Sequence, residues 1–147
     1  MRQKLMTCVA ILAGLIVTGS RAQVPALPPI EIADPAPSGV RVDDHEVFAN
    51  YFPGKGVGSR PGILLLAGSE GGLGSGTVHI ASALQAEGFS VLQLCYFGCP
   101  GLPAKLASVP LETFSSAPEW LRRRPDIDST RLAIVGGSKG AEAALLA

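Results

Sequence analysis

The sequence predicts an α/β fold, in which a mostly parallel sheet carries helices on both faces. Short apolar runs that are typical of buried strands alternate along the chain with segments of helical periodicity. This alternation is typical of βαβ units, whose crossover helices cover the faces of a parallel sheet. A length of 147 residues, 47% of them hydrophobic, predicts one domain with a core of its own.

The first 22 residues have the composition of an export signal. A basic start at residues 1–4 precedes an apolar run at residues 5–17, and Ser20 and Ala22 are small residues before a cleavage point. The apolar run has 13 residues, fewer than the roughly 20 that a membrane-spanning helix needs. We therefore expect a secreted or periplasmic protein with no stable membrane insertion after signal cleavage. An uncleaved membrane anchor is the alternative.

Residues 23–38 are rich in proline and have no apolar period, which predicts an extended lead-in rather than packed structure. The remaining residues 39–147 are predicted to form a partial α/β domain. The first two strands of this domain, at residues 40–44 and 45–52, alternate in polarity as an antiparallel pair does.

The rest of the domain is predicted from alternating strand and helix patterns. The predicted strands are residues 62–68, 89–97 and 131–137, the predicted helices are residues 77–88 and 111–123, residues 98–110 are a loop, residues 124–131 are a turn, and a further helix begins after the third of these strands. Because each of these strands is followed by a helix, we expect the three strands to run parallel.

Composition narrows the classes of partner. With 12 basic and 12 acidic residues the net charge is zero, which predicts neither a nucleic-acid-binding surface nor an acidic tail. No cofactor or metal is predicted, because Cys95 and Cys99 have no second Cys or His pair at metal-binding spacing. The two thiols either stay unpaired or form a local disulfide, which requires a turn through Phe97 and Gly98. The expected partner is a small molecule, and the sequence does not predict an oligomeric state.

The candidate catalytic residue is Ser138. The run from Gly136 to Gly140 matches the pattern G-x-S-x-G at the junction of a predicted strand and a predicted helix, which is the setting of a nucleophile elbow. In such a turn the glycines at both ends avoid collisions, and the serine stands clear of the sheet at the start of the helix. A purely structural glycine turn is the alternative.

Backbone N–H groups near this serine are candidate donors to an oxyanion. The N–H of Lys139 lies at the start of the predicted helix, where N–H groups are unpaired and carry partial positive charge. A second donor is expected from the loop after the first parallel strand, at Ser69 or Glu70. A plain glycine-rich connection is the alternative for this loop.

The sequence offers no general base in the expected order. His45 and His79 both precede Ser138, whereas the acid and the histidine follow the serine in hydrolases of this type. We predict that both histidines are structural, His45 at the start of a strand and His79 on a helix face. Because the sequence stops within an apolar helical run, we also expect a fragment that lacks the Asp and the His and is inactive and poorly stable alone.

Three segments of the chain, residues 61–73, 87–103 and 109–147, together resemble the C-terminal catalytic domain of the acyl-CoA thioester hydrolase and bile acid-CoA:amino acid N-acyltransferase family. The resemblance implies the N-terminal part of an α/β-hydrolase fold related to dienelactone hydrolases, incomplete at the C-terminus. It implies Ser138 as nucleophile, with the N–H groups of Lys139 and of Ser69 or Glu70 as the oxyanion hole. A serine in place of cysteine implies hydrolysis of an acyl ester or thioester, and export leaves the acyl carrier open.

Two other classes of protein fit parts of the sequence. Gly68, Gly72 and Gly74 match the glycine spacing of a short-chain dehydrogenase, but no acidic residue ends the next strand to bind a ribose. An exported binding protein that keeps the fold without catalysis is the other alternative.

Three apolar side chains after the second parallel strand are candidates for an acyl pocket or for core packing: Tyr96, Phe97 and Leu102.

Overall fold

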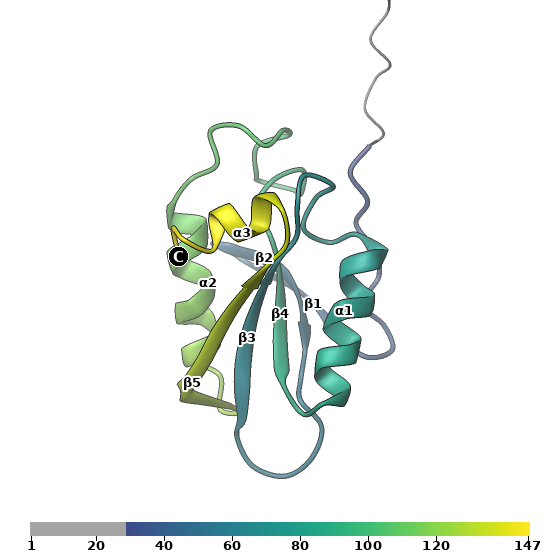
Figure 1. Cartoon of the computed structure of the whole chain (residues 1–147), viewed down its shortest axis with the longest axis vertical. Helices are drawn as coiled ribbons and strands as arrows, with labels where there is room; N and C mark the ends of the chain where they lie inside the picture. Colours follow the sequence, from purple (N-terminus) through teal and green to yellow (C-terminus); the bar gives the residue numbers. More distant parts are fainter. Residues whose placement is uncertain (1–28) are drawn as a thin grey trace, which may run out of the picture.

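The computed structural model describes residues 29–147. The predicted export signal and residues 23–28 of the lead-in lie outside the described residues. None of the helices in residues 29–147 has the length and apolarity needed to cross a membrane. The described part is built around a five-stranded sheet (Figure 1).

The sheet has the strand order β1-β2-β4-β3-β5. The strands are β1 (Val40–Asp44), β2 (Val47–Phe52), β3 (Arg60–Leu66), β4 (Ser90–Cys95) and β5 (Ile127–Gly136). The hairpin β1–β2 pairs antiparallel with β4, while β4, β3 and β5 are parallel to one another. The predicted α/β sheet is confirmed, with mixed strand directions, and the three parallel strands end at the same edge.

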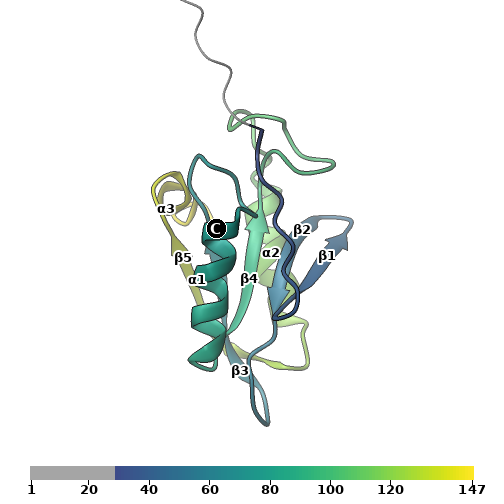
Figure 2. The ribbon, with the colours of Figure 1, turned by 90° about the vertical axis from the view of Figure 1, so that its right-hand side faces the viewer.

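Helices cover both faces of the sheet, as predicted. Helix α1 (Ser75–Ala86) lies on one face, and α2 (Glu112–Arg122) and α3 (Lys139–Ala143) lie on the other (Figures 1 and 2). The pleat of β3 explains this division, since successive side chains of a strand point to opposite faces. Ile63 and Leu65 pack in one cluster with residues of α1, whereas Leu64 and Leu66 pack in the other with residues of α2.

Strand β5 begins earlier than the sequence predicts. The turn predicted over residues 124–131 is wrong from Ile127 onward, because β5 begins there and its first two residues, Ile127 and Asp128, already pair with β3. Asp128 Oδ1 accepts hydrogen bonds from the N–H (3.0 Å) and the Oγ1 (2.6 Å) of Thr130, and the pairing register shifts opposite Pro61. The turn-forming residues therefore produce an irregularity within a strand. At this edge of the sheet Ile134 and Val135 are exposed.

The described part of the lead-in packs against the domain. Residues 29–38 contain no helix or strand, but Ile30 packs against the main core cluster and Pro35 is buried. The N–H of Ala33 donates to the carbonyl of Leu73 (2.8 Å), and Gln85 Nε2 donates to the carbonyl of Ser38 (2.8 Å). The expectation of an unpacked lead-in is therefore wrong for these residues.

Cys95 and Cys99 form a disulfide, which decides between the two alternatives left open by the sequence. Their Cα atoms are 6.4 Å apart, and Gly98, with φ of 75°, provides the turn that brings them together. The disulfide packs against Leu73 in a small buried cluster. The disulfide therefore closes the turn that follows β4, and its packing against Leu73 places that turn beside the loop that leads into α1.

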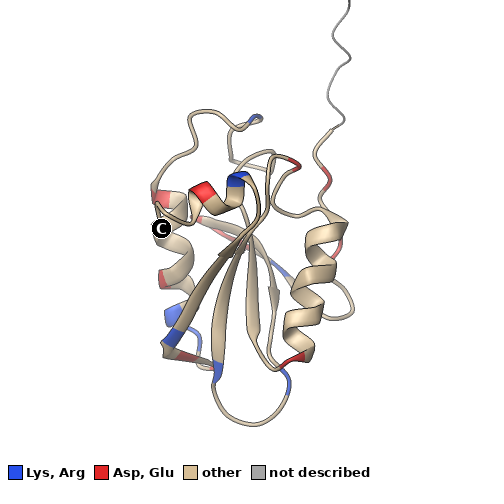
Figure 3. Cartoon of the chain, in the orientation of Figure 1, with Lys and Arg blue, Asp and Glu red and all other residues tan. Residues whose placement is uncertain are grey.

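Charged residues of both signs lie at both ends of the sheet and on α2 and α3, whereas α1 carries none (Figure 3). Two ion pairs, Arg122–Glu119 and Lys139–Glu142, are exposed pairs within one helix turn. Exposed pairs of this kind contribute only about 0–1 kcal/mol each. The stability of the fold therefore depends mainly on the two apolar clusters that flank the sheet.

Candidate active site

Ser138 lies in a strained turn between β5 and α3. Strand β5 ends at Gly136 and α3 begins at Lys139, so the chain reverses within two residues. The backbone of Ser138 has φ 52° and ψ −120°, a region that costs a residue other than glycine about 1–3 kcal/mol. Among the described residues Ser108 is the other non-glycine residue with positive φ. The hydroxyl of Ser138 is therefore held at an exposed bend at the start of a helix.

The glycines on either side of Ser138 are required by close backbone contacts. A Cβ atom on Gly136 would overlap with the carbonyl oxygen of Gly140, and one on Gly140 would overlap with the carbonyl oxygens of Leu66 and Ala67. The N–H of Gly137 donates to the carbonyl of Leu66 (3.1 Å). The turn is thus packed tightly against the end of β3.

The loop after β3 lies beside Ser138. A Cβ atom built on Gly68 would lie 3.2 Å from the Cβ of Ser138 and 2.5 Å from Oε2 of Glu70. The carboxylate of Glu70 accepts a hydrogen bond from the N–H of Gly68 (3.0 Å). The structure therefore brings together Ser138 and the loop of Ser69 and Glu70, which the sequence could associate only by motif.

The three N–H groups predicted as oxyanion donors are available for hydrogen bonding. Within residues 29–147, the backbone N–H groups of Lys139, Ser69 and Glu70 donate no hydrogen bond to another loop or helix end. All three residues are exposed. The N–H of Gly71 donates to the carbonyl of Gly68 (3.3 Å) and closes the loop as a turn. Free N–H groups beside an exposed serine can stabilise negative charge that develops on a bound carbonyl oxygen.

Tyr96 holds the carbonyl side of the same loop. Its hydroxyl donates to the carbonyl of Ala67 (2.5 Å), and its ring is buried. Burial, and then the negative charge of Glu70, raise the pKa of Tyr96 to about 12, so the hydroxyl keeps its proton at neutral pH. From the sequence, Tyr96 is a candidate for a pocket or for core packing, and no pattern shows that its hydroxyl anchors the loop.

An apolar cavity of about 310 Å³ lies next to the serine turn. It is lined by Tyr96, Leu106, Val109, Leu111, Phe114, Lys139, Glu142, Ala143 and Leu146. Tyr96 lines this cavity and also packs in the main core cluster, whereas Phe97 packs edge-on against Tyr96 and Leu102 packs beside the disulfide. The side chain of Lys139 is held by Glu142, with Nζ 2.8 Å and 2.9 Å from its two carboxylate oxygens.

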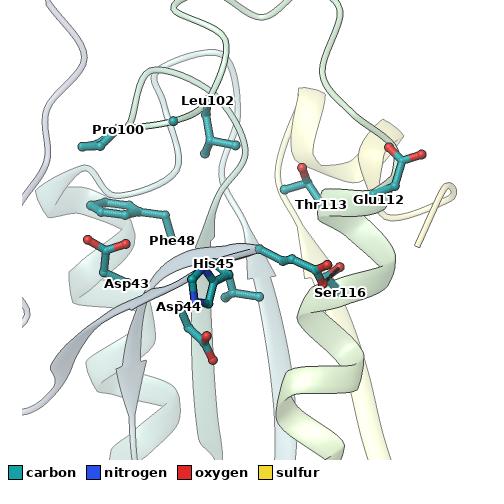
Figure 4. Close-up of a pocket in the computed structure, with 12 residues that line it drawn as sticks. Asp43, Asp44, His45, Phe48, Pro100, Leu102, Glu112, Thr113 and Ser116 are labelled. Carbon is teal, nitrogen blue, oxygen red and sulfur yellow. Dashed lines mark hydrogen bonds between the residues drawn. The ribbon is translucent and has the colours of Figure 1, made fainter.

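Neither histidine lies in this site. His45 occupies the tight turn between β1 and β2, rather than the start of a strand, and lines a hollow of about 210 Å³ together with acidic residues (Figure 4). Strand β1 is four strand spacings from β5, which is about 19 Å at the usual spacing of neighbouring strands. His79 is exposed on α1. No hydrogen bond among the described residues joins either histidine to Ser138.

The start of α1 does not offer the position that a dinucleotide would use. Oε2 of Glu31 accepts hydrogen bonds from the N–H and the Oγ of Ser75, both at 3.0 Å. A carboxylate therefore already occupies the anion-binding end of this helix. Gly72 packs against the backbone of Leu94 and Cys95, so its lack of a side chain is explained by packing. Among residues 29–147, no group of three or more His, Cys, Asp or Glu side chains is placed to hold a metal ion.

The sequence of the chain is similar to the sequences of curated acyl-coenzyme A enzymes. No family model matches the chain. The chain is 41% identical over 106 residues to acyl-coenzyme A thioesterase 6 of Mus musculus, which covers 72% of this chain and 25% of that protein. It is 38% identical over 105 residues to acyl-coenzyme A amino acid N-acyltransferase 1 of Mus musculus, covering 71% of this chain and 24% of that protein. The chain thus spans about a quarter of the length of these relatives.

Solved structures with a similar fold belong to α/β hydrolases. The dienelactone hydrolase-like promiscuous phosphotriesterase P91 from metagenomic libraries superposes with a TM-score of 0.62 at 18% identity, over 74% of this chain and 52% of that chain. The α/β hydrolase GrgF from Penicillium has a TM-score of 0.57 at 16% identity, over 72% of this chain and 39% of that chain. These similarities identify the described fold as a partial α/β-hydrolase fold.

Proposed function

Since the chain belongs, over the 72% of its length that matches, to the family of acyl-coenzyme A thioesterases and acyl-coenzyme A amino acid N-acyltransferases, we propose that it is a serine hydrolase of acyl esters or thioesters. Ser138 is the nucleophile in this proposal. The N–H groups of Lys139 and of Ser69 or Glu70 form the oxyanion hole. The substrate is a small acyl ester or thioester whose carrier is left open, and no cofactor takes part.

The observation that carries this proposal is the strained, exposed serine beside N–H groups that are free to bind an anion. In the proposed step the Oγ of Ser138 forms a bond to the acyl carbon, and the bond from that carbon to the leaving oxygen or sulfur breaks. The hydroxyl proton passes to a base and then to the leaving group. While the carbon is tetrahedral, its oxygen carries negative charge, which the free N–H groups stabilise.

Hydrolysis is proposed rather than transfer to an amine because the nucleophile is serine. In the family that the sequence resembles, cysteine is typical where an amine is the acyl acceptor.

The proposal assigns the nucleophile and the oxyanion donors to the described residues. It assigns no general base, because His45 and His79 lie elsewhere in the fold. The composition of residues 1–22 supports a secreted or periplasmic location.

The proposal is tested by covalent acetylation with p-nitrophenyl acetate. Added imidazole serves as the base, p-nitrophenolate leaves, and intact-mass spectrometry measures the acetyl groups that the chain acquires. We expect the wild-type chain to acquire one acetyl group rapidly, and Ser138→Ala to lose that fast phase. If the two chains acetylate at the same rate, the nucleophile is misassigned, and the non-catalytic binding protein becomes the better account of the fold.

A further inference from the structure

Ile30 connects the loop of the proposed oxyanion hole to the disulfide loop. A Cβ atom on Gly71 would overlap with Cγ2 of Ile30, and a Cβ atom on Gly98 would overlap with Cδ1 of the same side chain. The side chain of Ile30 therefore rests against the α-carbons of both glycines. Gly71 follows Ser69 and Glu70 directly, so Ile30 restricts how far this loop can move.

Glu31 and Ala33 tie the following stretch of the same loop to the lead-in. Oε2 of Glu31 accepts hydrogen bonds from the N–H and the hydroxyl of Ser75, and the N–H of Ala33 donates to the carbonyl of Leu73 (2.8 Å). Arg41 Nη2 donates to the carbonyl of Ala33 (2.7 Å) and fixes the lead-in itself to β1. Residues 71–75 are thus held from outside the sheet by a segment of the chain some forty positions earlier.

We propose that Ile30 and Glu31 are positioning residues for the active site, which fix the loop of Ser69 and Glu70 so that its N–H groups face Ser138. The inference rests on the proposed function, because positioning matters only if these N–H groups bind an oxyanion. Oxyanion donors act only at the correct distance, and a displacement of about 1 Å can cost up to 100-fold in rate. The lead-in is therefore part of the catalytic unit and not only a tether.

The test compares Ile30→Ala with Ile32→Ala in the full chain. Ile32 is two residues away in the same segment, and its side chain is 41% exposed, so its truncation leaves the loop contacts in place. Ile30→Val is the conservative variant, because it keeps most of the contact with Gly71. Glu31→Gln keeps an oxygen that accepts from Ser75, whereas Glu31→Ala removes it.

Two quantities are measured for each variant. The first is the rate constant for acetylation of Ser138 by p-nitrophenyl acetate with imidazole, resolved by peptide mapping and compared with that of Ser108 in the same molecule. The second is the NMR order parameter of the Ser69 and Glu70 amides. Ser108 is the internal reference for the reactivity of an ordinary exposed serine, because it is exposed and lies in another loop.

We expect Ile30→Ala to slow acetylation of Ser138 roughly 10-fold with no change at Ser108, and to lower both order parameters below about 0.6. Ile32→Ala should match the wild type, while Ile30→Val and Glu31→Gln should keep most of the rate. Equal rates and order parameters in Ile30→Ala and the wild type would overturn the positioning role, as would equal effects of Ile30→Ala and Ile32→Ala.

The result also separates the positioning role from the proposed function. If Ser138 of the wild type acetylates no faster than Ser108, the proposed function fails. The order parameters then decide alone: a fall in Ile30→Ala that is absent from Ile32→Ala supports the positioning of the loop, and unchanged values overturn it.

Discussion

Gly68 faces the side chain of Ser138 so closely that a methyl group on Gly68 would lie 3.2 Å from the Cβ of the serine. The two residues follow neighbouring parallel strands, β3 and β5, whose last paired residues are Leu66 and Gly136. The register of the sheet therefore sets the distance between the candidate nucleophile and the loop that carries the candidate oxyanion donors. A rigid pair of strands is a precise support for such an arrangement.

Substitution of Gly68 should impair the site without unfolding the protein. In Gly68→Ala the added methyl group displaces the Glu70 carboxylate and presses on Ser138, while the backbone is unstrained because φ of Gly68 is not positive. We expect acetylation of Ser138 to slow by about 10-fold or more. Gly76→Ala is the control, since nothing lies within 4 Å of its added methyl group, and in a helix the change should stabilise by about 0.5–1 kcal/mol. A Gly68→Ala chain that acetylates as fast as the wild type would show that the contact is unimportant.

Gly140 should be intolerant of any side chain for structural reasons. A Cβ atom at this position meets the carbonyl oxygens of Leu66 and Ala67, and backbone atoms at the end of β3, which is paired on both sides, cannot move aside. We predict that Gly140→Ala lowers the free energy of unfolding by about 3 kcal/mol in urea titrations. Gly137→Ala, where nothing lies within 4 Å, should change it by less than about 0.5 kcal/mol. Similar losses in both variants would argue against the tight turn.

The buried tyrosines predict a loss of stability at high pH. The pKa values of Tyr51 and Tyr96 are raised from 10 to about 12 in the folded chain, in both cases chiefly by burial. The neutral phenol is therefore favoured in the folded state, and its stabilising contribution is complete below pH 10 and is lost as the pH rises from 10 to 12. The free energy of unfolding should fall less over this range in Tyr96→Phe than in the wild type. Parallel pH profiles for the two chains would contradict the assignment.

Tyr96→Phe also tests the anchoring of the loop at neutral pH. The variant removes the hydrogen bond to the carbonyl of Ala67, which should cost about 1 kcal/mol in the free energy of unfolding. Because the loop then loses an anchor next to Gly68, acetylation of Ser138 should slow as well. Tyr51→Phe is the matched control, because it removes the hydroxyl of another buried tyrosine, which donates to Asp126 just before β5 (2.5 Å) and not to the loop beside Ser138, so it should cost stability without slowing acetylation. An unchanged rate in Tyr96→Phe would restrict the hydroxyl to a role in stability.

The sequence predicts the elements that have a strong pattern. The apolar runs of β3 and β4 and the helical pattern of α1 and α2 indicate buried strands and covering helices, and the glycines around Ser138 indicate the sharp turn. Asp128 and Thr130 explain the wrong prediction of a turn at residues 127–131, because hydrogen bonds of the kind they make with each other are typical of turns. In the structure the pairing with β3 outweighs this local preference and leaves a strand with an irregular register.

Other parts of the candidate site depend on contacts that no local pattern encodes. Ile30 stands among prolines without any apolar period, so its contact with Gly71 and Gly98 appears only when the chain is folded. The hydroxyl of Tyr96 is likewise a long-range anchor, 29 positions from the carbonyl of Ala67. The sequence left open whether Cys95 and Cys99 pair, and the turn at Gly98 in the structure brings them together as a disulfide.

The most direct measurement is the crystal structure of the chain after reaction with an aryl phosphonate. The phosphorus of such a reagent bonds to the Oγ of Ser138 while its bond to the aryloxide breaks, the hydroxyl proton passes to a base in solution, and a phosphonyl oxygen is left where the oxyanion of an acyl transfer would lie. We predict that this oxygen accepts hydrogen bonds at about 2.7–3.1 Å from the N–H of Lys139 and from the N–H of Ser69 or Glu70, with φ of Ser138 still positive. A phosphonyl oxygen that points into solvent, or a Ser138 with relaxed negative φ, would contradict the proposed active site.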